Sequence, residues 1–545
     1  MLVDEVITNL SYSRGADRAL LELTIGDLLR RTASRFPERL AVAARHQGRR
    51  MSWAELSEAA DRVARGLWAL GIRRGDRVGL WSTNCIEWLM MHMGCARAGA
   101  ALVNVNPAYR SHELGYTLER SGMKALFLWH KDKRADYAEI LGRACHGRTL
   151  ALQHTVFFDT PEWPALLDAE GRLPDHVAVD DVANIQYTSG TTGMPKGVML
   201  THHNVVNNGR FLAQGFHYTE QDRIVVPVPL FHCYGCVIGT MSAVNSGAAI
   251  ILPNWTFDAR ATLQAVHDER ATSVYGVPAM YVAEFGLPEF ASYDLTSLRT
   301  GMMSGAPCPV ELMKRVLNEM HIGELVIAYG QTELSPVVTM SDAGDTIEVR
   351  VNTVGRAMPQ TEIKIVSTET DETLPFGQQG EICARGYAVM KGYDGDPEGT
   401  AQVIQPDGWL RTGDLGVMRD DGCIHLTGRS RDVIIRGGEN IYPREVEEFL
   451  YTHPKVGEVQ VVGIPHERLG EIVVAWVRLR PSQTATEEEI RAFCQGQIAY
   501  YKIPEYVRFV DEFPATLSGK IQKYKIREFE IEARGLQAVA KTAMA

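Results

Sequence analysis

The sequence contains no uninterrupted run of about 18 apolar residues, and we therefore predict no transmembrane helix. Residues 1–10 carry acidic side chains and lack a basic segment followed by an apolar one, so we expect no signal peptide. Residues 541–545 match no signal for retention, peroxisomal import or prenylation. These absences favour a cytoplasmic protein without an integral membrane segment.

Basic residues are fewer than acidic ones: the sequence has 56 Lys and Arg and 67 Asp and Glu, which gives a net charge of −11. Such an excess of acid argues against general binding to nucleic acid or to an anionic membrane, although it leaves room for a local anion site. The nine cysteines are scattered and odd in number, which excludes a disulfide framework and fits a reducing compartment. Cys233 and Cys236 have redox-motif spacing, but they lie in an apolar run without a β-α-β pattern, and a redox role is disfavoured.

With 545 residues and 45% hydrophobic residues, the chain is globular and too long for one ordinary core, so we expect about three packed units. Helical and strand patterns alternate in the first half. Residues 53–70 have the three- and four-residue apolar spacing of an amphipathic helix, and residues 77–81 have the pattern of a short strand. Further strand candidates are residues 101–105, 125–129, 224–229, 248–252, 273–277 and 325–329. Strands separated by helices predict parallel sheets that are covered on both faces.

The pattern changes twice in the second half. After about residue 355, short β-branched runs separated by Gly, Pro and Asp predict a β-rich unit, and from residue 428 helices and strands alternate again. We therefore expect an α/β protein with a large N-terminal domain, residues 1–430. Doubly wound α/β/α sheets would occupy residues 1–355, and a small β-rich subdomain residues 356–430. A small α+β C-terminal domain, residues 431–545, would follow.

The strongest local signal is YTSGTTGMPKGV at residues 187–198. Its glycines allow backbone N–H groups to converge on an anion, its hydroxyls add donors, and Lys196 adds a positive charge. This pattern predicts a loop that holds a polyphosphate, placed between a strand and a helix. The spacing is not that of a P-loop. A plain flexible surface loop is the alternative.

This run resembles the phosphate-loop signature of the adenylate-forming superfamily, which includes acyl- and aryl-CoA synthetases, peptide-synthetase adenylation domains and beetle luciferases. The resemblance extends from about Leu23 to Phe529. Further motifs occur in the family's order: PLFHCYG at 229–235, SGAP at 304–307, YGQTE at 329–333, TGD at 412–414, GRSRD at 428–432, GGENIYPRE at 437–445 and SGKIQK at 518–523. Several ordered motifs are far more specific than any one of them.

The resemblance implies a two-step reaction with ATP, Mg²⁺ and coenzyme A. A carboxylate attacks the α-phosphate of ATP and gives an acyl-adenylate and pyrophosphate, and a thiol then displaces AMP. It also implies that the C-terminal domain is mobile and rotates about a hinge at Arg431, where the family usually has Asp or Lys. Charge that accumulates on the α-phosphate is stabilised by a lysine and a magnesium ion placed beside it.

The resemblance assigns a large set of residues to the nucleotide and to coenzyme A. These residues are Thr188, Ser189, Gly190, Thr191, Thr192, Gly193, Lys196, Gly305, Ala306, Pro307, Tyr329, Gly330, Gln331, Thr332, Asp414, Arg429, Gly437, Gly438, Asn440 and Lys520. Within it, Tyr329 is expected to stack on adenine and Asp414 to accept both ribose hydroxyls. A buried core tyrosine and a plain turn, respectively, are the alternatives.

Four residues are expected to take part in catalysis. Glu333 and Thr191 resemble the family's magnesium contacts, which suit a hard cation that keeps several waters. Lys520 resembles the lysine that bridges the attacking carboxylate and the α-phosphate. His232 borders the acyl pocket and the thiol tunnel in the family. The alternatives are a helix-terminal acid for Glu333, a solvated basic cluster for Lys520 and a core histidine for His232.

The choice of branch depends on the acyl pocket. Residues 227–235 contain no acid that could pair with an amino-acid ammonium, so amino-acid activation is disfavoured. The pocket-forming stretches, residues 233–240, 275–285, 302–307 and 334–338, are largely apolar and uncharged. We therefore expect a medium- or long-chain fatty acid as substrate, with aryl and polyketide-like acids still open.

The acyl acceptor is expected to be coenzyme A, because residues 354–428 are compact and show no extra hydrophobic segment. The alternative is an acyl-adenylate ligase that loads a carrier protein. A luciferase-like oxygenation and a degenerate ATP-binding protein without turnover are further alternatives, of which the second is disfavoured by the intact motifs. The expected partners are the small-molecule acid, ATP and coenzyme A, and a homodimer stays open.

Overall fold

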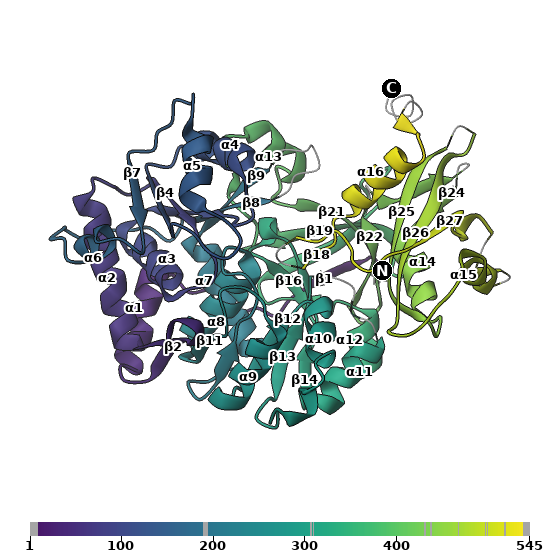
Figure 1. Cartoon of the computed structure of the whole chain (residues 1–545), viewed down its shortest axis with the longest axis horizontal. Helices are drawn as coiled ribbons and strands as arrows, with labels where there is room; N and C mark the ends of the chain where they lie inside the picture. The colour runs from purple at the N-terminus through teal and green to yellow at the C-terminus, as the bar shows by residue number, and fades with distance from the viewer. Residues whose placement is uncertain are drawn as a thin grey trace, which may run out of the picture. The chain divides into compact units, whose positions relative to one another are not determined.

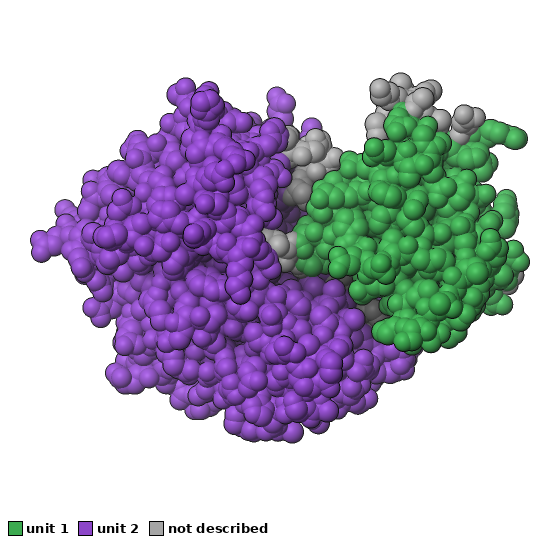
Figure 2. Space-filling view, viewed as in Figure 1, with its two compact units in different colours: residues 1–12, 364–383, 412–545 green, residues 13–363, 384–411 purple. Residues whose placement is uncertain are grey.

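The computed structural model describes residues 9–188, 195–305, 308, 310–429, 432–436, 439–466, 468–495, 497–498, 500–516 and 519–537. The chain divides into two compact units (Figures 1 and 2). The larger unit comprises residues 13–363 and 384–411, and the other comprises residues 1–12, 364–383 and 412–545. Arg431, the predicted hinge, lies outside the described residues, and the domain boundary at residue 430 stays a prediction.

The larger unit contains two seven-stranded sheets. In spatial order, the first consists of β14 (Glu324–Val326), β13 (Thr300–Met303), β12 (Ser273–Gly276), β10 (Arg223–Val225), β11 (Ala249–Leu252), β2 (Leu40–Ala44) and β3 (Arg49–Ser52). The second consists of β20 (Gly392–Tyr393), β9 (Lys196–Thr201), β8 (Val182–Thr188), β5 (Ala101–Val105), β4 (Arg77–Trp81), β6 (Ala125–Leu128) and β7 (His154–Phe157). Neighbouring strands are parallel except where β3, β9 and β20 pair antiparallel at one edge of each sheet.

Helices cover these sheets, as the alternating pattern predicts (Figure 1). They are α1 (Ile25–Arg35), α2 (Trp53–Ala69), α3 (Ile86–Ala98), α4 (Ser111–Ser121), α5 (Tyr137–Cys145), α6 (Glu162–Leu167), α7 (His202–Gly215), α8 (Thr240–Ser246), α9 (Ala259–Glu269), α10 (Pro278–Phe285), α11 (Val310–Glu319), α12 (Ile347–Asn352) and α13 (Pro397–Val403). Helix α3 is buried at every residue and contacts β2 of one sheet and β4 and β5 of the other. A helix that is buried around its whole circumference suits such a position between two sheets. The α/β fold class is confirmed.

The strand expected at residues 325–329 is wrong as a single element. It divides into β14, in the parallel sheet, and β15 (Ala328–Gly330), which pairs antiparallel with β16 (Val337–Met340). The break falls at Ile327, whose N–H donates to Ser341 Oγ at 2.9 Å. Ser341 N in turn donates to Ile327 O at 2.8 Å. The two bonds satisfy the Ile327 backbone outside the parallel sheet, and β17 (Arg356–Ala357) completes the small sheet.

The remaining strands form two five-stranded sheets. One has the order β1 (Tyr12–Arg14), β18 (Thr361–Val366), β19 (Gln379–Gly386), β21 (Leu410–Met418) and β22 (Ile424–Arg429). The other has the order β24 (Glu439–Ile441), β23 (Ile434–Arg436), β26 (Gly470–Leu479) and β25 (Val456–His466), with β27 (Tyr506–Phe509) paired to β26.

Alternating side chains of β26 build two small cores in the C-terminal region. Val473, Ala475 and Val477 pack with α14 (Pro443–Tyr451) and α15 (Glu487–Cys494), while Val474 and Trp476 pack with α16 (Lys523–Ala533). Because successive strand residues point to opposite faces, one strand supplies both cores.

In the described ranges, no helix is long and apolar enough to cross a membrane.

Candidate active site

The expected phosphate loop joins two antiparallel strands. Thr188 ends β8 and lies opposite Lys196, which begins β9. The predicted residues between them, Ser189, Gly190, Thr191, Thr192 and Gly193, lie outside the described residues. The expected helix after the loop is wrong, because β9 intervenes and α7 begins only at His202, after the N-cap Thr201. Strand β9 is short and its buried residues do not alternate with exposed ones, so the sequence has no period-two pattern that would predict it.

Lys196 is partly buried at the mouth of this hairpin. Its Nζ lies 4.7 Å from the ring centroid of Tyr393, in β20, and 3.7 Å from Asp396 Oδ2. A cation over an aromatic face is attracted by the ring quadrupole, and the carboxylate is at the outer limit of an ion pair. The lysine is therefore held in place with only loose neutralisation by its acid.

Glu333 is linked to the same tyrosine. It lies in the 3₁₀ turn η4 (Thr332–Leu334), where its Oε1 accepts a hydrogen bond of 3.0 Å from the Tyr393 hydroxyl. Its backbone carbonyl accepts a bond of 2.9 Å from Met390 N. Burial and the nearby Glu333 charge raise the pKa of Tyr393 above its usual range, so the hydroxyl stays a donor. Tyr393 therefore joins the predicted polyphosphate lysine to the predicted magnesium ligand.

The Glu333 carboxylate suits a magnesium ion in its donor type. An ionised carboxylate offers about four acceptor positions, of which Tyr393 takes one at Oε1. Thr191, the second expected contact, lies outside the described residues. Within the part of the chain that the structure describes, no group of three or more His, Cys, Asp or Glu side chains could hold a metal. A magnesium ion here would therefore depend on substrate phosphates and waters for most of its ligands.

The residues expected around adenine follow two strand ends. Gly305, with a φ of +86°, comes after β13, and the preceding Ser304 donates from Oγ to Ala328 O at 2.7 Å. Ala328 begins β15, so this bond ties the SGAP turn to the YGQTE strand. Tyr329 is 7% exposed. Ala306 and Pro307 lie outside the described residues.

Gly330, Gln331 and Thr332 continue that strand into η4. A Cβ at Gly330 would lie 1.8 Å from Pro336 O, so only glycine allows this close approach of two backbone segments. Thr332 is buried, and its Oγ1 lies 3.7 Å from Cys233 Sγ. The YGQTE and PLFHCYG motifs, about 100 residues apart in the sequence, therefore meet in the fold.

His232 precedes the π-helical turn η2 (Tyr234–Gly239). Its Nδ1 accepts a hydrogen bond of 3.1 Å from Tyr234 N, which places the proton of the neutral ring on Nε2. The side chain is half-buried. The neighbouring Cys233 and Cys236 are free and buried, and burial raises the pKa of both thiols, that of Cys233 to about 12. Because the thiolate is the reactive form, two buried thiols that stay protonated argue against a redox role.

One stretch expected to line the acyl pocket contains a buried acid. Glu284, on α10, is 1% exposed, and burial raises its pKa to about 8. Its Oε2 has no hydrogen-bond partner among the described residues. At neutral pH the group is mostly protonated, so the stretch stays uncharged although the sequence has an acid there.

In the other unit, two predicted residues lie opposite each other on neighbouring strands. Asp414 in β21 is the register partner of Arg429 in β22. Asp414 is 5% exposed, and its N–H donates to Thr412 Oγ1 at 3.1 Å. Gly413 has a φ of +71°, and its N–H donates to Glu381 Oε1 at 3.0 Å. The TGD motif is thus a fixed bend within a strand, and its ribose role stays a prediction.

Asn440 lies in the hairpin of β23 and β24, opposite Ile435. Gly437 and Gly438, which separate these two strands in the sequence, lie outside the described residues. Their predicted proximity to the thiol of coenzyme A stays a prediction.

Lys520 is exposed on a tight turn of the same unit. Its N–H donates to Thr516 Oγ1 at 3.1 Å, and its carbonyl accepts from Thr516 N at 2.8 Å. Gly519 has a φ of +79°, which favours glycine. The nearby Lys523 is bound to Glu447 at 2.6 Å, and Arg527 to Glu471 at 2.6 Å. These pairs argue against the alternative of a uniformly solvated basic cluster.

Comparisons with known proteins match this arrangement along nearly the whole chain. The family described as AMP-binding enzyme matches residues 29–394, and its C-terminal domain matches residues 445–520. YngI of Bacillus subtilis (strain 168), to which an acyl-CoA synthetase activity is ascribed, is 45% identical over 95% of this chain and 99% of its own. The medium-chain acyl-CoA ligase ACSF2, mitochondrial, of Mus musculus is 42% identical over 96% of this chain and 90% of its own.

Solved structures agree with the sequence relatives. ATP-bound MatB from Rhodopseudomonas palustris superposes with a TM-score of 0.82 at 30% identity, over 93% of this chain and 99% of its own. The match therefore extends over both sequence and fold. The chain belongs to the family of AMP-binding enzymes.

Proposed function

We propose that the protein is an ATP-dependent acyl-CoA synthetase that activates a medium- or long-chain fatty acid. The observation that carries the proposal is the 42% identity to a ligase named for medium-chain acids, sustained over 96% of this chain. The link from Lys196 through Tyr393 to Glu333 supports it, since it joins two predicted phosphate-site residues of separate motifs.

In the proposed first step, a carboxylate oxygen attacks the α-phosphorus of ATP and pyrophosphate leaves. Lys196 and the loop that follows Thr188 would hold the phosphates, and Asp414 would accept the ribose hydroxyls. Lys520 would bridge the incoming carboxylate and the α-phosphate. Magnesium, when bound at Glu333, would neutralise charge that develops on the phosphates.

In the proposed second step, the thiol of coenzyme A attacks the acyl carbonyl carbon. The bond between this carbon and the phosphate-linked oxygen breaks, and AMP leaves with that oxygen. His232 borders this reaction in the proposal, but its Nδ1 is already occupied by Tyr234 N. We therefore assign His232 to positioning rather than to proton abstraction.

A substrate panel tests the acyl specificity. AMP release would be measured for acids from C2 to C18 and for aryl acids, with and without coenzyme A. We expect a higher kcat/KM for C8–C16 acids than for acetate, because each buried methylene contributes about 0.8 kcal/mol until the pocket is full. A preference for acetate, an aryl acid or an α-amino acid would contradict the proposal. Release that depends on an acyl carrier protein instead of coenzyme A would favour the alternative acceptor.

We also propose a cytoplasmic location. The acidic composition and the nine scattered cysteines, which suit a reducing compartment, support it, while the mouse relative is named as mitochondrial. Fractionation of cells that produce the tagged protein would decide between a cytoplasmic and an organellar or membrane-associated location.

A further inference from the structure

A basic cavity opens on the larger unit where α1 and α7 end. It has a volume of about 330 Å³, and Arg31, Arg35 and Arg210 contribute to its wall. Arg31 and Arg35 belong to the last turns of α1, and Arg210 belongs to α7. His217 and Gln214 add further hydrogen-bonding groups at the exposed rim. Three arginines therefore line one cavity of a protein whose net charge is −11.

The cavity wall contains no carboxylate among the described residues. Arg31 is half-buried, and its Nε has no hydrogen-bond partner among these residues. Burial and the charges of Arg35 and Arg210 lower the pKa of Arg31, so the three cations repel one another. Arg210 donates to the carbonyl of Ala19, which occupies one of the five N–H donors of its guanidinium group. Most of the donor capacity of the trio therefore has no acceptor among the residues that the structure describes.

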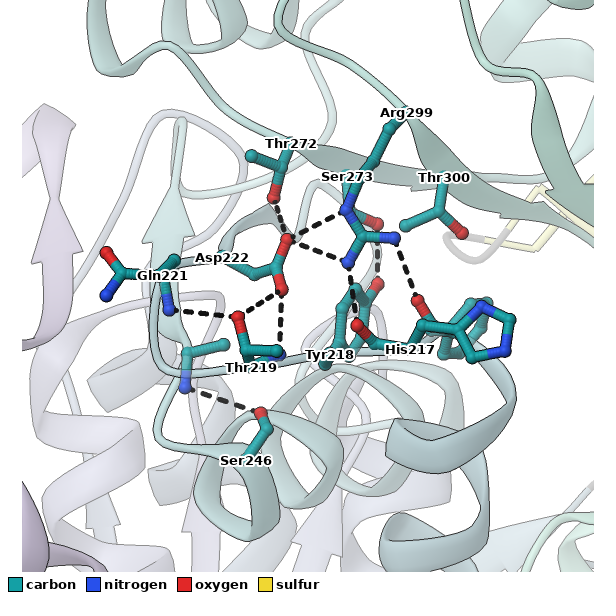
Figure 3. A network of polar contacts seen from close by, with 12 residues as sticks. His217, Tyr218, Thr219, Gln221, Asp222, Ser246, Thr272, Ser273, Arg299 and Thr300 are labelled. Atoms are coloured by element: carbon teal, nitrogen blue, oxygen red, sulfur yellow. Dashed lines mark hydrogen bonds and ion pairs between the residues drawn. The ribbon is translucent and has the colours of Figure 1, made fainter.

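Arg299, close to the same cavity, shows how this fold treats a structural arginine. Its guanidinium group lies 2.9 Å from Asp222 Oδ1 (Figure 3). It also lies 3.1 Å from Glu324 Oε2. It also donates to the carbonyls of Phe216 and His217, at 3.1 and 3.0 Å. Arg299 thus carries its own counter-ions and fixes the segment that forms one side of the cavity.

Helix dipoles account for part of the arginine placement but not for all of it. Cations are stabilised at helix C-termini, where Arg31 and Arg35 lie. The effect falls off within the last turn, so it accounts for Arg35 in α1 but not for Arg210, because α7 has no basic residue in its last turn. It also does not supply the missing counter-ion for a trio in one cavity. A bound anion would supply that counter-ion and would use the unpaired donors.

The cavity and the expected nucleotide site lie at opposite ends of the parallel strands. His217 precedes β10 and Ser246 precedes β11, so both lie at the amino ends of parallel strands. Gly305 follows β13 of the same sheet, at the carboxyl ends. Since these strands are parallel, the cavity lies at their amino ends and the expected nucleotide site at their carboxyl ends.

We propose that the Arg31–Arg35–Arg210 cavity is a binding site for a multiply charged phosphate-type anion, distinct from the catalytic nucleotide site. Planar guanidinium groups bind phosphate oxygens through paired hydrogen bonds, and three of them match an anion with several oxygens. The same chemistry is present in free pyrophosphate or phosphate and in an anionic lipid headgroup. A cavity whose donors lie partly below the surface favours a free anion.

Calorimetric titration of the full-length protein with pyrophosphate, in low-salt, magnesium-free buffer, tests the site. We expect Arg31→Gln/Arg210→Gln to weaken this binding by at least about tenfold, because two charge-assisted contacts are lost. Arg30→Gln is the matched control, since Arg30 lies on the same helix but is paired with Asp27. Lys196→Ala, at the expected catalytic loop, should leave this binding in place. Equal binding by the double variant, or its loss only in Lys196→Ala, would overturn the proposal.

Thermal unfolding supplies a second readout, which separates binding from folding. We expect phosphate to raise the Tm of the wild type and of Arg30→Gln, but not that of the double variant. Without phosphate, the double variant should unfold no earlier than the control, because repulsion is relieved. If the double variant fails to fold, Arg35→Gln should lower the affinity by about threefold through its exposed cation. The absence of any phosphate-dependent rise in the wild type would overturn the site.

Vesicle sedimentation distinguishes the two sources of the anion. We expect equal, low sedimentation with phosphatidylglycerol and phosphatidylcholine vesicles. Binding to phosphatidylglycerol that the double variant abolishes, together with no binding of free pyrophosphate, would overturn the assignment to a free anion.

Discussion

Two lysines are predicted to act on the same ATP molecule, and their surroundings differ sharply. Lys196 is partly buried, with its Nζ 4.7 Å from the Tyr393 ring centroid and 3.7 Å from Asp396. Lys520 is exposed on a turn, where its N–H donates to Thr516 Oγ1 and its carbonyl accepts from Thr516 N. The first cation is partly buried between side chains of its own unit, whereas the second lies at an exposed position.

The different surroundings of Lys196 and Lys520 suit different kinds of contact with ATP. A preorganised cation costs little reorganisation when the phosphates arrive, so Lys196 suits a permanent contact. An exposed lysine loses side-chain entropy when it is ordered, so Lys520 suits a contact that is made in one step and released in the other.

The largest effect is expected for Lys520→Ala. It should slow adenylation by at least about a hundredfold, because one cation beside the developing charge is lost. Its rate of thioester formation from added acyl-adenylate and coenzyme A should be close to that of the wild type. Both half-reactions would be followed separately, by pyrophosphate exchange and by thioester release, with Lys525→Ala as a control on the same segment. Equal loss in both steps would contradict a step-specific role.

Gly438→Leu should have the opposite pattern. If this glycine borders the path of the thiol, a branched side chain would block the arm while leaving the phosphate contacts unaffected. We expect acyl-adenylate to form at a near-normal rate and thioester release to fall by about tenfold or more. Adenylate that accumulates in a quenched reaction measures this directly, and unchanged thioester release would remove Gly438 from the predicted path.

Glu333→Gln should slow adenylation by at least about tenfold at saturating magnesium, since one charge of the metal contact is lost. The fold should stay intact, because the amide can still accept the Tyr393 hydrogen bond. The apparent magnesium affinity in pyrophosphate exchange is the readout. Unchanged exchange would leave Glu333 with only a structural role.

Tyr393→Phe should have a smaller effect, about fivefold on adenylation, because it removes one hydrogen bond while keeping the ring under Lys196. Tyr393→Leu should cost more, since the ring is lost as well. Comparison of the two variants separates the bond to Glu333 from the cation–ring contact. An effect of the same size for both would show that the ring contact with Lys196 contributes nothing.

A separate effect, on stability rather than on activity, is expected from Glu284→Gln. Burial raises the pKa of Glu284 to about 8 from an ordinary 4.5, so between these values the folded state holds a proton that the unfolded state releases. Stability contributed by this group therefore falls as the pH rises from about 4.5 to about 8, by at most about 1.4 kcal/mol per unit. The variant should gain in Tm over the wild type from pH 5 to pH 8. Glu170→Gln, at an exposed position, is the control, and a pH-independent difference would contradict the buried acid.

Regular elements of the larger unit were predictable because their signals are local. The strands at residues 77–81 and 101–105 have the predicted bounds, since each is a short apolar run between turn residues. Helix α2 ends one residue before the prediction, and its N-cap Ser52 forms a capping box with Glu55 that fixes its start. In such elements the neighbouring turn and capping residues predict where the helix or strand begins and ends.

Elements defined by distant partners were not predictable in the same way. Residues 325–329 form one apolar run, yet the hydrogen bonds to Ser341 divide it between two sheets. Tyr393 lies in a strand of two residues, Gly392–Tyr393, which has no period to detect, and its importance comes from contacts with Lys196 and Glu333. The arginine cavity is likewise lined by residues about 180 positions apart in the sequence, so no local motif could predict it.

The path of one carboxylate oxygen tests the central claim most directly. The wild-type protein would be incubated with ATP, magnesium, coenzyme A and decanoate labelled with ¹⁸O in its carboxylate. If acyl-adenylate forms and the thiol then breaks its acyl carbon–oxygen bond, one labelled oxygen stays on phosphorus. We predict that mass spectrometry finds this label in AMP, with thioester in equal amount. Unlabelled AMP, or ADP with labelled inorganic phosphate, would contradict an AMP-forming acyl-CoA synthetase.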